Sequence, residues 1–546
     1  MQRRKIVARL VCTGLIITAA CILGSTVRVG GTPSPQSGPV PLDTTSQTYV
    51  LFLDMQEVES LHNVEMVVNQ AEKHPANPVL PTGDLNDFDF HQASSWGGSV
   101  IFDEDEKVFK LWYVGARGGL YEQRVGYAWS TDGIVWHKPQ LGLYEFRGSK
   151  ENSITYQAPV GNFLYGALHP GLTDHFAVFK DYREPNPEKR YKGYNNIYAK
   201  SPTHNDATHF PVYSSDGIHW KVSSTAVASY PPNDIGNIFI DYDDPNPDRR
   251  IKIYEHNEAA YGPDLEHCHP DSNNPVIGGA NFAGAKKDGL EDTVHLATAI
   301  HYRGYYIMLY DYDFWLPYYD YKGKADIRKR DSRVPQPKTG IFTGDARLAM
   351  NRDGIGKFTR VNPDQPLIAR GKRSDWDGGF IVAAPPVLHD DKFYIFYTGV
   401  EEVGGISNPQ WGETDDPSAI RTGLATLRLD GFTNLQTKDG LSRGTATTKA
   451  IEVKQADSAR LVLNAGNLMP YRDWVEVELL DANTNLPIPG YEAKDCTSIF
   501  QEGVRIPVQW GQHKTLGGVQ ASAIKVRFYL YGQVKLYSFH FESPQP

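Results

Sequence analysis

The sequence predicts an all-β protein that consists of a five-bladed β-propeller followed by a C-terminal β-sandwich. Three observations predict this fold class: a Ser-x-Asp-Gly-Ile-x-Trp stretch that occurs twice, five similar strand-rich segments, and a change to cleanly alternating strands from about residue 441. A repeat of about 40 to 50 residues with several short strands in each copy is typical of propeller blades.

The repeated stretch reads STDGIVW at residues 130–136 and SSDGIHW at residues 214–220. Asp-Gly between two alternating apolar runs indicates a hairpin turn, because Gly tolerates positive φ and the Asp side chain binds nearby backbone. Each turn should therefore join two antiparallel strands, and its Trp should pack between neighbouring sheets. Weaker copies lie around Asp353 and Asp430, where chance recurrence of a common turn dipeptide explains the pattern equally well.

Five predicted strands share a basic or polar start and a β-branched and aromatic body. They begin at Lys107, Lys189, Arg249, Arg303 and Asp391. Another extended run precedes each of them, so each unit reads as strand, turn, strand, loop, strand, Asp-Gly turn and strand. Five such units predict five blades. A short segment at residues 55–74 is the one stretch with helical character.

Composition and charge agree with this architecture and exclude one class of partner. Aromatic residues make up 12% of the 546 residues, and 50 Gly with 36 Pro suit many short strands joined by turns. The chain is too long for a single domain. The formal net charge of -10 gives no basic surface, so nucleic acid is not expected as a partner.

The N-terminus is predicted to be a targeting segment. Residues 1–24 combine a basic start with a short apolar core, as in a signal peptide or lipoprotein signal, and residues 25–47 form a Pro/Ser-rich linker. We therefore expect export to the periplasm, cell surface or exterior. TAAC, which ends at Cys21, resembles a lipoprotein cleavage box with Thr18 in place of the usual Leu, so lipid anchoring at Cys21 and an uncleaved anchor both stay open. Membrane attachment is expected through this segment only.

The rest of the chain divides into two predicted domains. Residues 48–440 are assigned to the propeller with an N-terminal lead-in, and residues 441–546 to the sandwich, whose runs alternate regularly. The sandwich has few converging acidic or nucleophilic residues, so it either braces the propeller or binds sugar. Cys268 and Cys496 fall in different domains and are expected to be free thiols.

At this point the chain resembles a known group of proteins. YAWSTDGIVWHKPQLGL and GLATLRLDGF at blade edges resemble the five-bladed propellers of glycoside hydrolase families 32 and 43, and LFLDMQEVES, KHPANPVL, FKLWYVG and KLYSFHFE resemble uncharacterised exported bacterial members of that superfamily. The Asn-Asp-Pro-Asn-Gly and Glu-Cys strings of family 32 are absent from this sequence. The resemblance implies an exported glycosidase whose base or nucleophile belongs to the first blade, a stabilising Asp to the second and a Glu acid to a later one.

The predicted topology locates the chemistry. The start of each first strand and the end of each second strand should open on one face, and every unit offers a carboxylate there. Glycoside hydrolysis uses one carboxyl as acid and another as nucleophile or base. By position, the resemblance implies Asp89 as nucleophile or base, Asp174 as stabiliser and Glu255 as acid. The predicted catalytic set is Asp89, Asp174, Asp234, Glu255, Asp292 and Asp377.

Aromatic and histidine side chains beside these carboxylates are predicted to contact the sugar. They are His91, Trp96, His175, His256, Trp315 and Trp376. No cofactor is expected, although a structural cation at the propeller centre is compatible with the pattern, and a metal site at His256, His267, Cys268 and His269 is the weaker interpretation of that cluster. The sequence leaves two functions open: a hydrolase acting on an oligosaccharide or polysaccharide, and a non-catalytic carbohydrate-binding or scaffold propeller.

Overall fold

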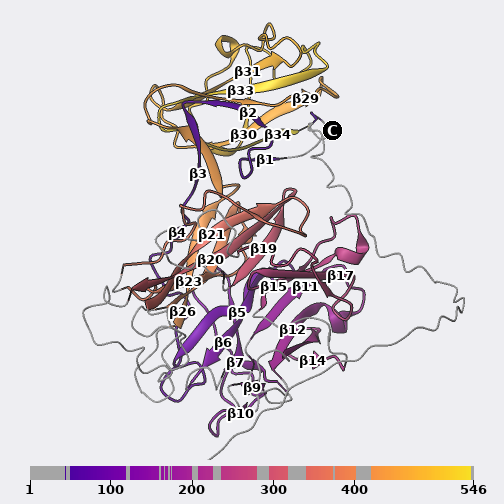
Figure 1. The fold of residues 1–546 in the computed structure, drawn as a ribbon, viewed down its shortest axis with the longest axis vertical. Coiled ribbons are helices and arrows are strands. Elements are labelled where there is room, and N and C mark those ends of the chain that lie inside the picture. Colours follow the sequence, from indigo (N-terminus) through magenta and orange to yellow (C-terminus); the bar gives the residue numbers. More distant parts are fainter. Residues whose placement is uncertain are drawn as a thin grey trace, which may run out of the picture. The chain divides into compact units, whose positions relative to one another are not determined.

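The computed structural model is all-β with several sheets (Figure 1). It describes residues 43–44, 49–117, 123–158, 162–164, 167–169, 173, 175–198, 207–224, 235–278, 294, 296–317, 340–372, 375–400 and 420–542. The helices given there are three-residue 3-10 turns at Pro187–Lys189, Pro247–Arg249 and Ala493–Asp495. No helix within these ranges has the length and apolar character needed to cross a membrane.

Five antiparallel units of four strands follow one another along the chain. Unit 1 contains β5 (Gln92–Asp103), β6 (Val108–Ala116), β7 (Arg124–Ser130) and β8 (Ile154–Tyr156). Unit 2 contains β11 (Phe176–Lys180), β12 (Tyr191–Tyr198), β13 (Ala207–Ser214) and β14 (Lys221–Val222). Unit 3 contains β15 (Ile235–Ile240), β16 (Ile251–Glu255), β17 (Glu258–Gly262) and β18 (His269–Pro270).

The last two units follow the same order, and the fifth is completed from the N-terminal side of the chain. Unit 4 contains β19 (Ala297–Tyr302), β20 (Tyr305–Pro317), β21 (Gly340–Asn351) and β22 (Thr359–Arg360). Unit 5 contains β23 (Phe380–Ala383), β25 (Lys392–Val400), β26 (Ile420–Arg428) and β4 (Glu72–Lys73), with β24 (Val387–His389) also paired to β25. Short parallel pairings join β21 to β23 and β26 to β5, and β9 (Asn162–Leu164) and β10 (Ala167–His169) form a separate hairpin.

The expected helix at residues 55–74 is wrong. This segment forms β2 (Val58–His62), β3 (Val64–Val68) and the short β4. Its β-branched valines favour strands, and Asn63 turns the chain between β2 and β3 with a φ of 51°. Pairing of β2 with β28 (Gly444–Thr448) and of β3 with β27 (Thr433–Thr437) completes these strands, and these partners are distant in the sequence.

Both copies of the Ser-x-Asp-Gly turn have the predicted local structure. In the second copy, Asp216 Oδ1 accepts hydrogen bonds from the backbone N–H of Ile218 and His219, each at 2.8 Å, and the turn joins β13 to β14. Gly217 has a φ of 77°, which suits glycine, and its carbonyl accepts a 2.6 Å hydrogen bond from Trp112 Nε1 in unit 1. The turn of one unit therefore covers an aromatic side chain of the preceding unit.

The Trp of each turn packs between neighbouring units, as predicted. Trp220 of unit 2 lies against Trp112 of unit 1 with ring centroids 6.1 Å apart. Trp136 of unit 1 lies against Phe396 of unit 5 at 5.5 Å. The weaker copy of the turn around Asp353 makes the same kind of contact as the Gly217 turn, because the Tyr254 hydroxyl of unit 3 donates a hydrogen bond to the Gly354 carbonyl of unit 4.

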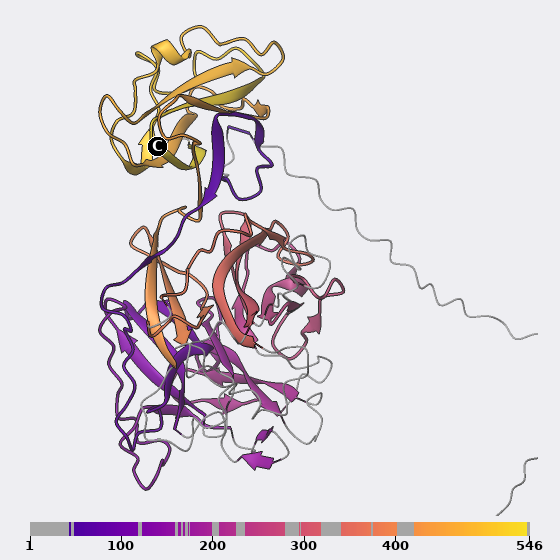
Figure 2. The same cartoon turned by 60° about the vertical axis from the view of Figure 1, so that its left-hand side comes forward.

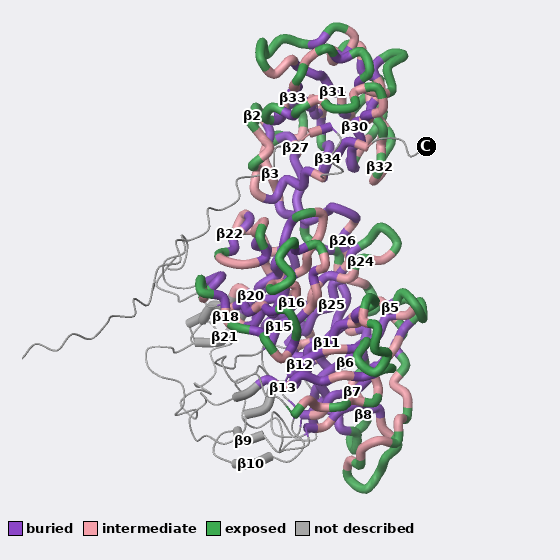
Figure 3. Tube along the Cα trace, turned by 90° about the vertical axis from the view of Figure 1, so that its right-hand side faces the viewer, coloured by how far each residue is buried: buried purple, intermediate pink, exposed green. Residues whose placement is uncertain are grey.

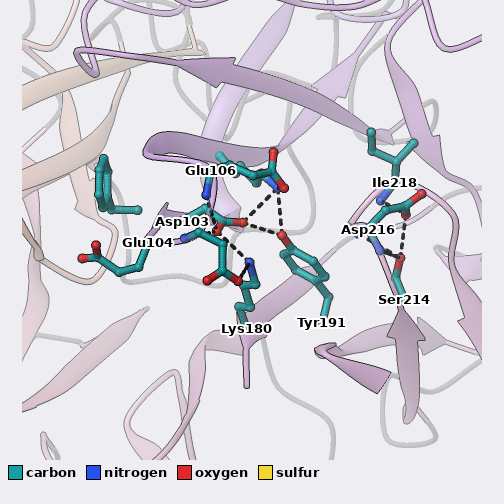
Figure 4. Close-up of polar contacts among 12 residues, drawn as sticks. Asp103, Glu104, Glu106, Lys180, Tyr191, Ser214, Asp216 and Ile218 are labelled. Atoms are coloured by element: carbon teal, nitrogen blue, oxygen red, sulfur yellow. Dashed lines mark hydrogen bonds and ion pairs between the residues drawn. The ribbon is translucent and has the colours of Figure 1, made fainter. Parts of the chain in front are cut away.

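Buried carboxylates at the ends of first strands connect successive units. Asp103 of unit 1 accepts Lys180 of unit 2, Tyr242 of unit 3 donates to Asp181 of unit 2, and Asp241 of unit 3 binds His301 of unit 4. Figure 4 shows the first of these clusters, in which Tyr191 also donates to Asp103, beside the Ser214 turn. Charge-assisted hydrogen bonds of this kind are stronger than neutral ones and hold adjacent units in register.

Eleven strands in two sheets form the sandwich, and three of them come from the N-terminal side. One sheet contains β2, β28 (Gly444–Thr448), β33 (Ala523–Tyr531), β29 (Ile451–Glu452) and β31 (Trp474–Asp481). The other contains β3, β27 (Thr433–Thr437), β34 (Lys535–Glu542), β30 (Arg460–Gly466), β32 (Gly503–Pro507) and β1 (Val50–Leu51). Figure 2 shows the indigo N-terminal strands within the same sandwich as the yellow C-terminal ones.

The sandwich therefore differs in extent from the range predicted for it. β1–β3 and β27 fall within the 48–440 segment assigned to the propeller domain, yet β1 and β27 pair with β34, β2 pairs with β28, and β3 pairs with β27. Val50, Phe52 and Val64 are buried in the same hydrophobic core as Trp510 and Phe528. The two sheets need both ends of the chain to cover this core, and Figure 3 shows buried, intermediate and exposed stretches side by side in the sandwich.

Acid should weaken the sandwich through His540. This side chain is 5% exposed and stacks on Tyr49 at 4.0 Å, and burial lowers the pKa of His540 to about 4 from 6.5. The unfolded chain binds a proton at higher pH than the folded chain, so stability is complete above pH 6.5 and falls towards pH 4 by about 3 kcal/mol. Urea unfolding at pH 7.5 and 4.5 measures this loss. In His540→Phe, which keeps the ring stacking, the difference should shrink by that amount; an unchanged difference would refute the assignment.

Candidate active site

One end of the units gathers the polar side chains that could perform chemistry. The first residue of each first strand pairs there with a residue in the later part of the second strand, as in Phe176 with Asn195 and Ile235 with Glu255. Asn195 and Glu255 are both fully buried. Burying a polar side chain costs free energy that burying an apolar side chain does not. Buried polar side chains at equivalent positions of neighbouring units therefore indicate a polar site.

Glu255 and His209 form the most site-like pair within the described residues. Glu255 ends β16 in unit 3, His209 lies in β13 of unit 2, and His209 Nε2 is 2.9 Å from Glu255 Oε1. The two side chains are 0% and 3% exposed, and the His209 ring stacks on Tyr194 at 5.7 Å. This pair can carry its proton on the imidazole, as an ion pair, or on the carboxyl group, which is the arrangement that a general acid needs.

Trp96 and His175 lie at the same end of the neighbouring units. Their ring centroids are 6.3 Å apart at 71°. Trp96 lies in a bulge of β5 where the ladder with β6 is interrupted between Ser94 and Ser99, and its backbone N–H donates to Thr398 Oγ1 at 2.8 Å. Bulges next to sites reorient a side chain out of the regular ladder. Two of the predicted sugar-contacting residues are thus brought together.

Asp311 also lies at this end, in β20 of unit 4. Its side chain is 1% exposed, and Oδ1 accepts a 2.7 Å hydrogen bond from the backbone N–H of Leu296. This contact fixes the carboxylate beside the start of β19. Asp311 and Glu255 are therefore two buried acidic groups contributed by adjacent units.

Asp89 and Asp377 have a different environment, and the two sites repeat each other. Asp89 accepts hydrogen bonds from Tyr113 at 2.8 Å and Lys138 at 2.6 Å. Asp377 accepts from Tyr397 at 3.0 Å and Lys73 at 2.6 Å. Burial and the adjacent Asp89 carboxylate raise the pKa of Tyr113, which therefore stays protonated as a donor.

The turns that carry these two aspartates are built alike. The backbone N–H of Asp84 donates to Asp87 Oδ2 at 2.7 Å, and that of Lys372 donates to Asp375 Oδ2 at 2.8 Å. Each turn runs from a Gly to an Asp-aromatic-Asp sequence, GDLNDFD at residue 83 and GKRSDWD at residue 371. Asp89 and Asp377 therefore brace a lysine and a tyrosine, and their catalytic role stays a prediction.

The remaining predicted residues are distributed as follows. Asp174, Asp234 and Asp292 lie outside the described residues, and so does the side chain of Trp315, whose backbone belongs to β20. His91 is 5% exposed with its Nδ1 3.5 Å from Arg117 Nη1, and His256 is half-buried in the turn between β16 and β17. Trp376 stacks on Tyr397 at 5.7 Å.

The histidine cluster near residue 268 is not assembled as a metal site. His267 Nδ1 is 2.7 Å from Asp264 Oδ1, and burial raises the pKa of Cys268 to about 12, so this thiol is a poor ligand. The free state of Cys268 and Cys496 is confirmed. Elsewhere in the described part of the chain, Asp241, Asp243 and His301 bring three potential ligand atoms within 4.8 Å of one another.

Sequence reasoning missed His209. It considered only the start of the first strand and the end of the second, whereas the third strand of an antiparallel unit begins at the same end. His209 is the third residue of β13, opposite Asn196. A histidine early in the third strand was the signal that could have identified it.

Comparisons with known proteins find distant similarities of fold. No family model matches the chain, and no curated protein matches it. A glycosyl hydrolase from Bacteroides ovatus is 14% identical, with a TM-score of 0.41, over 66% of this chain and 94% of that chain. The same values are found for a structure from the GH130 family of mannoside phosphorylases, which contains glycoside hydrolases that target β-1,2 mannosidic linkages in Candida mannan. An N-acetylgalactosamine deacetylase from F. plautii, in complex with blood group B trisaccharide, is 13% identical, with a TM-score of 0.40, over 67% of this chain and 96% of that chain.

Proposed function

We propose that the protein is an exported glycoside hydrolase whose five units close into a five-bladed propeller. Support for closure comes from contacts that run around all five units. The first strands β5, β11, β15 and β19 contact one another in that order, and β23 contacts β5. Trp136 of unit 1 packs on Phe396 of unit 5, as Trp220 of unit 2 packs on unit 1.

A central cavity supports the same arrangement. Its volume is about 490 Å³, and it is lined by residues of every unit, among them Val100, Phe179, Ile238, Ile300 and Val387. These residues lie in the later part of the first strands or just beyond it, away from the end that carries Glu255. A ring of five first strands leaves such a space at its axis.

The observation that carries the proposed reaction is the buried Glu255–His209 pair. In the proposal, Glu255 protonates the glycosidic oxygen of the leaving group, and His209 holds the carboxyl in place and shares its proton. A second carboxylate of the predicted set attacks the anomeric carbon or activates water. Glu255 has no exposed surface, so the proposal requires that glycan binding uncovers it.

The substrate is proposed to be an oligosaccharide or polysaccharide. Trp96 offers a ring on which the apolar C–H face of a sugar can stack, and His175 beside it offers hydrogen bonds. Export rests on the N-terminal segment alone, and mass spectrometry of the chain from a bacterial host tests it: the mature chain should begin after residue 18, and retention of Met1 in the cytoplasm would refute export.

One observation favours the non-catalytic alternative: Asp89 and Asp377, two of the predicted catalytic carboxylates, form ion pairs with lysines. An assay of the purified protein on a glycan panel decides between the two. Release of reducing ends by the wild-type chain, lost in Glu255→Gln, supports the hydrolase. A glycan that binds but is never cleaved supports the alternative and contradicts the proposed reaction.

A further inference from the structure

A line of aromatic rings crosses one end of the sandwich. It consists of Tyr471, Phe500, Trp474 and Tyr531, and we call it the aromatic line. Ring centroids lie 6.1 Å apart for Tyr471 and Phe500, 6.0 Å for Phe500 and Trp474, and 4.2 Å for Trp474 and Tyr531. Phe500, Trp474 and Tyr531 are half-buried, and Tyr471 is 94% exposed.

Hydrogen bonds hold the inner part of the aromatic line rigid. Glu476 accepts Trp474 Nε1 at 3.3 Å, Tyr531 Oη at 3.0 Å and Ser498 Oγ at 2.9 Å. Trp474 and Tyr531 are also directly opposite each other in β31 and β33, with ring planes only 10° apart. Rings that are fixed before a ligand arrives lose little conformational freedom on binding.

Tyr471 has a backbone that this residue type rarely adopts. Its φ is 63°, in the left-handed region, where Gly or Asn is the usual choice. The surrounding turn is held by backbone hydrogen bonds between Met469 and Asp473, and Asp473 is 1% exposed. An aromatic ring that is 94% exposed on an unfavourable backbone gains little from folding, so it points to binding.

The size and chemistry of the aromatic line favour a sugar over a protein. A stable protein interface buries about 800 Å² on each partner, whereas one fully buried aromatic side chain supplies about 150–250 Å², and three of these four rings are already half-buried. Flat rings with a carboxylate between them suit a pyranose, which presents an apolar C–H face and a rim of hydroxyl donors. Glu476 accepts from the Tyr531 hydroxyl, and the exposed Arg443 makes a hydrogen bond with Tyr531, so an acceptor and a donor lie at this end of the aromatic line.

We propose that the aromatic line is a carbohydrate-binding site, occupied by a pyranose-containing glycan chain that stacks on Tyr471. This site lies in the sandwich, is separate from the Glu255 end of the units and does not require catalysis. Of the two roles that the sequence left open for the sandwich, sugar binding is therefore assigned to this surface.

The test measures binding of the full chain in a Glu255→Gln background, which prevents cleavage. Xylan, arabinan, galactan, pectin and mannan are each cast into native gels, and retardation of the protein gives the affinity. We expect retardation by at least one polysaccharide and a loss of affinity of about tenfold or more in Tyr471→Ala, since one stacking ring is removed. Tyr471→Phe keeps the ring and should bind as the parent does.

Leu486→Ala is the matched control, because Leu486 is an exposed apolar side chain on another turn of the sandwich, at 65% exposure. It should leave retardation unchanged. The proposal is overturned if no polysaccharide retards the parent, if Tyr471→Ala binds as the parent does, or if this variant alters only self-association on size exclusion. Hydrolysis is measured separately on the wild-type protein and on Tyr471→Ala. This measurement distinguishes a loss of binding at the aromatic line from a failure of the proposed catalytic function.

Discussion

Replacing Glu255 by Gln should lower the turnover of a glycan that the wild-type protein cleaves by about 1,000-fold or more. Gln has the shape of Glu but carries no transferable carboxyl proton, so a loss of this size, about 4 kcal/mol of barrier, follows if Glu255 is the acid. Gln also fills the same space beside His209, so the fold should persist. Initial rates of reducing-end release, together with thermal unfolding of both proteins, measure the two effects.

A second substitution tests whether the loss of turnover depends on position 255 and not simply on the loss of one negative charge from the protein. Glu106→Gln makes the same chemical change at the other end of unit 1, where the Glu106 side chain is 57% exposed, and it should leave turnover unchanged. A substrate with a good leaving group needs less protonation and should partly restore the rate of Glu255→Gln. If this variant keeps turnover within about tenfold of wild type, Glu255 is not the acid.

Replacing Asp103 by Ala should lower the free energy of unfolding by about 3–5 kcal/mol. Asp103 is fully buried between Lys110 at 2.9 Å and Lys180 at 2.7 Å, whose side chains are 2% and 5% exposed. Burial alone would raise the pKa of Asp103, but hydrogen bonds from Lys180, Tyr191 and Lys110 hold it below its ordinary range. Removing the carboxylate leaves two buried ammonium groups short of a partner. Urea unfolding followed by circular dichroism measures the loss.

Asp105→Ala provides the comparison at the same lysine. Asp105 Oδ2 lies 2.9 Å from Lys180 Nζ, but its side chain is 57% exposed, so this change should cost about 1 kcal/mol or less. Because the Asp103 carboxyl pKa is lowered in the folded state, its contribution is present above pH 3.8 and is lost as the pH falls below that value. Equal losses of unfolding free energy in the two variants would show that burial of Asp103 does not determine how strongly its ion pairs stabilise the protein.

A feature could be predicted from the sequence when the interactions that form it join residues close together in the chain. The Ser130 and Ser214 turns were predictable, because each is closed by hydrogen bonds within three residues. Asp89 and Asp377 were not, because a carboxylate before a strand looks the same whether it meets a sugar or a lysine. Their lysine partners lie 49 and 304 positions away in the sequence.

The sequence by itself determined the all-β class, the five strand-rich units and the position of each second strand. These features follow from alternation of apolar side chains, from Gly at positive φ and from β-branched and aromatic residues, all of which act over a few neighbouring residues. Tertiary structure alone decided that residues 50–68 belong to the sandwich, and that β4 completes unit 5. It also brought His209 to Glu255, since partners far apart in the chain are chosen by the burial and hydrogen bonding that each gains in the folded state.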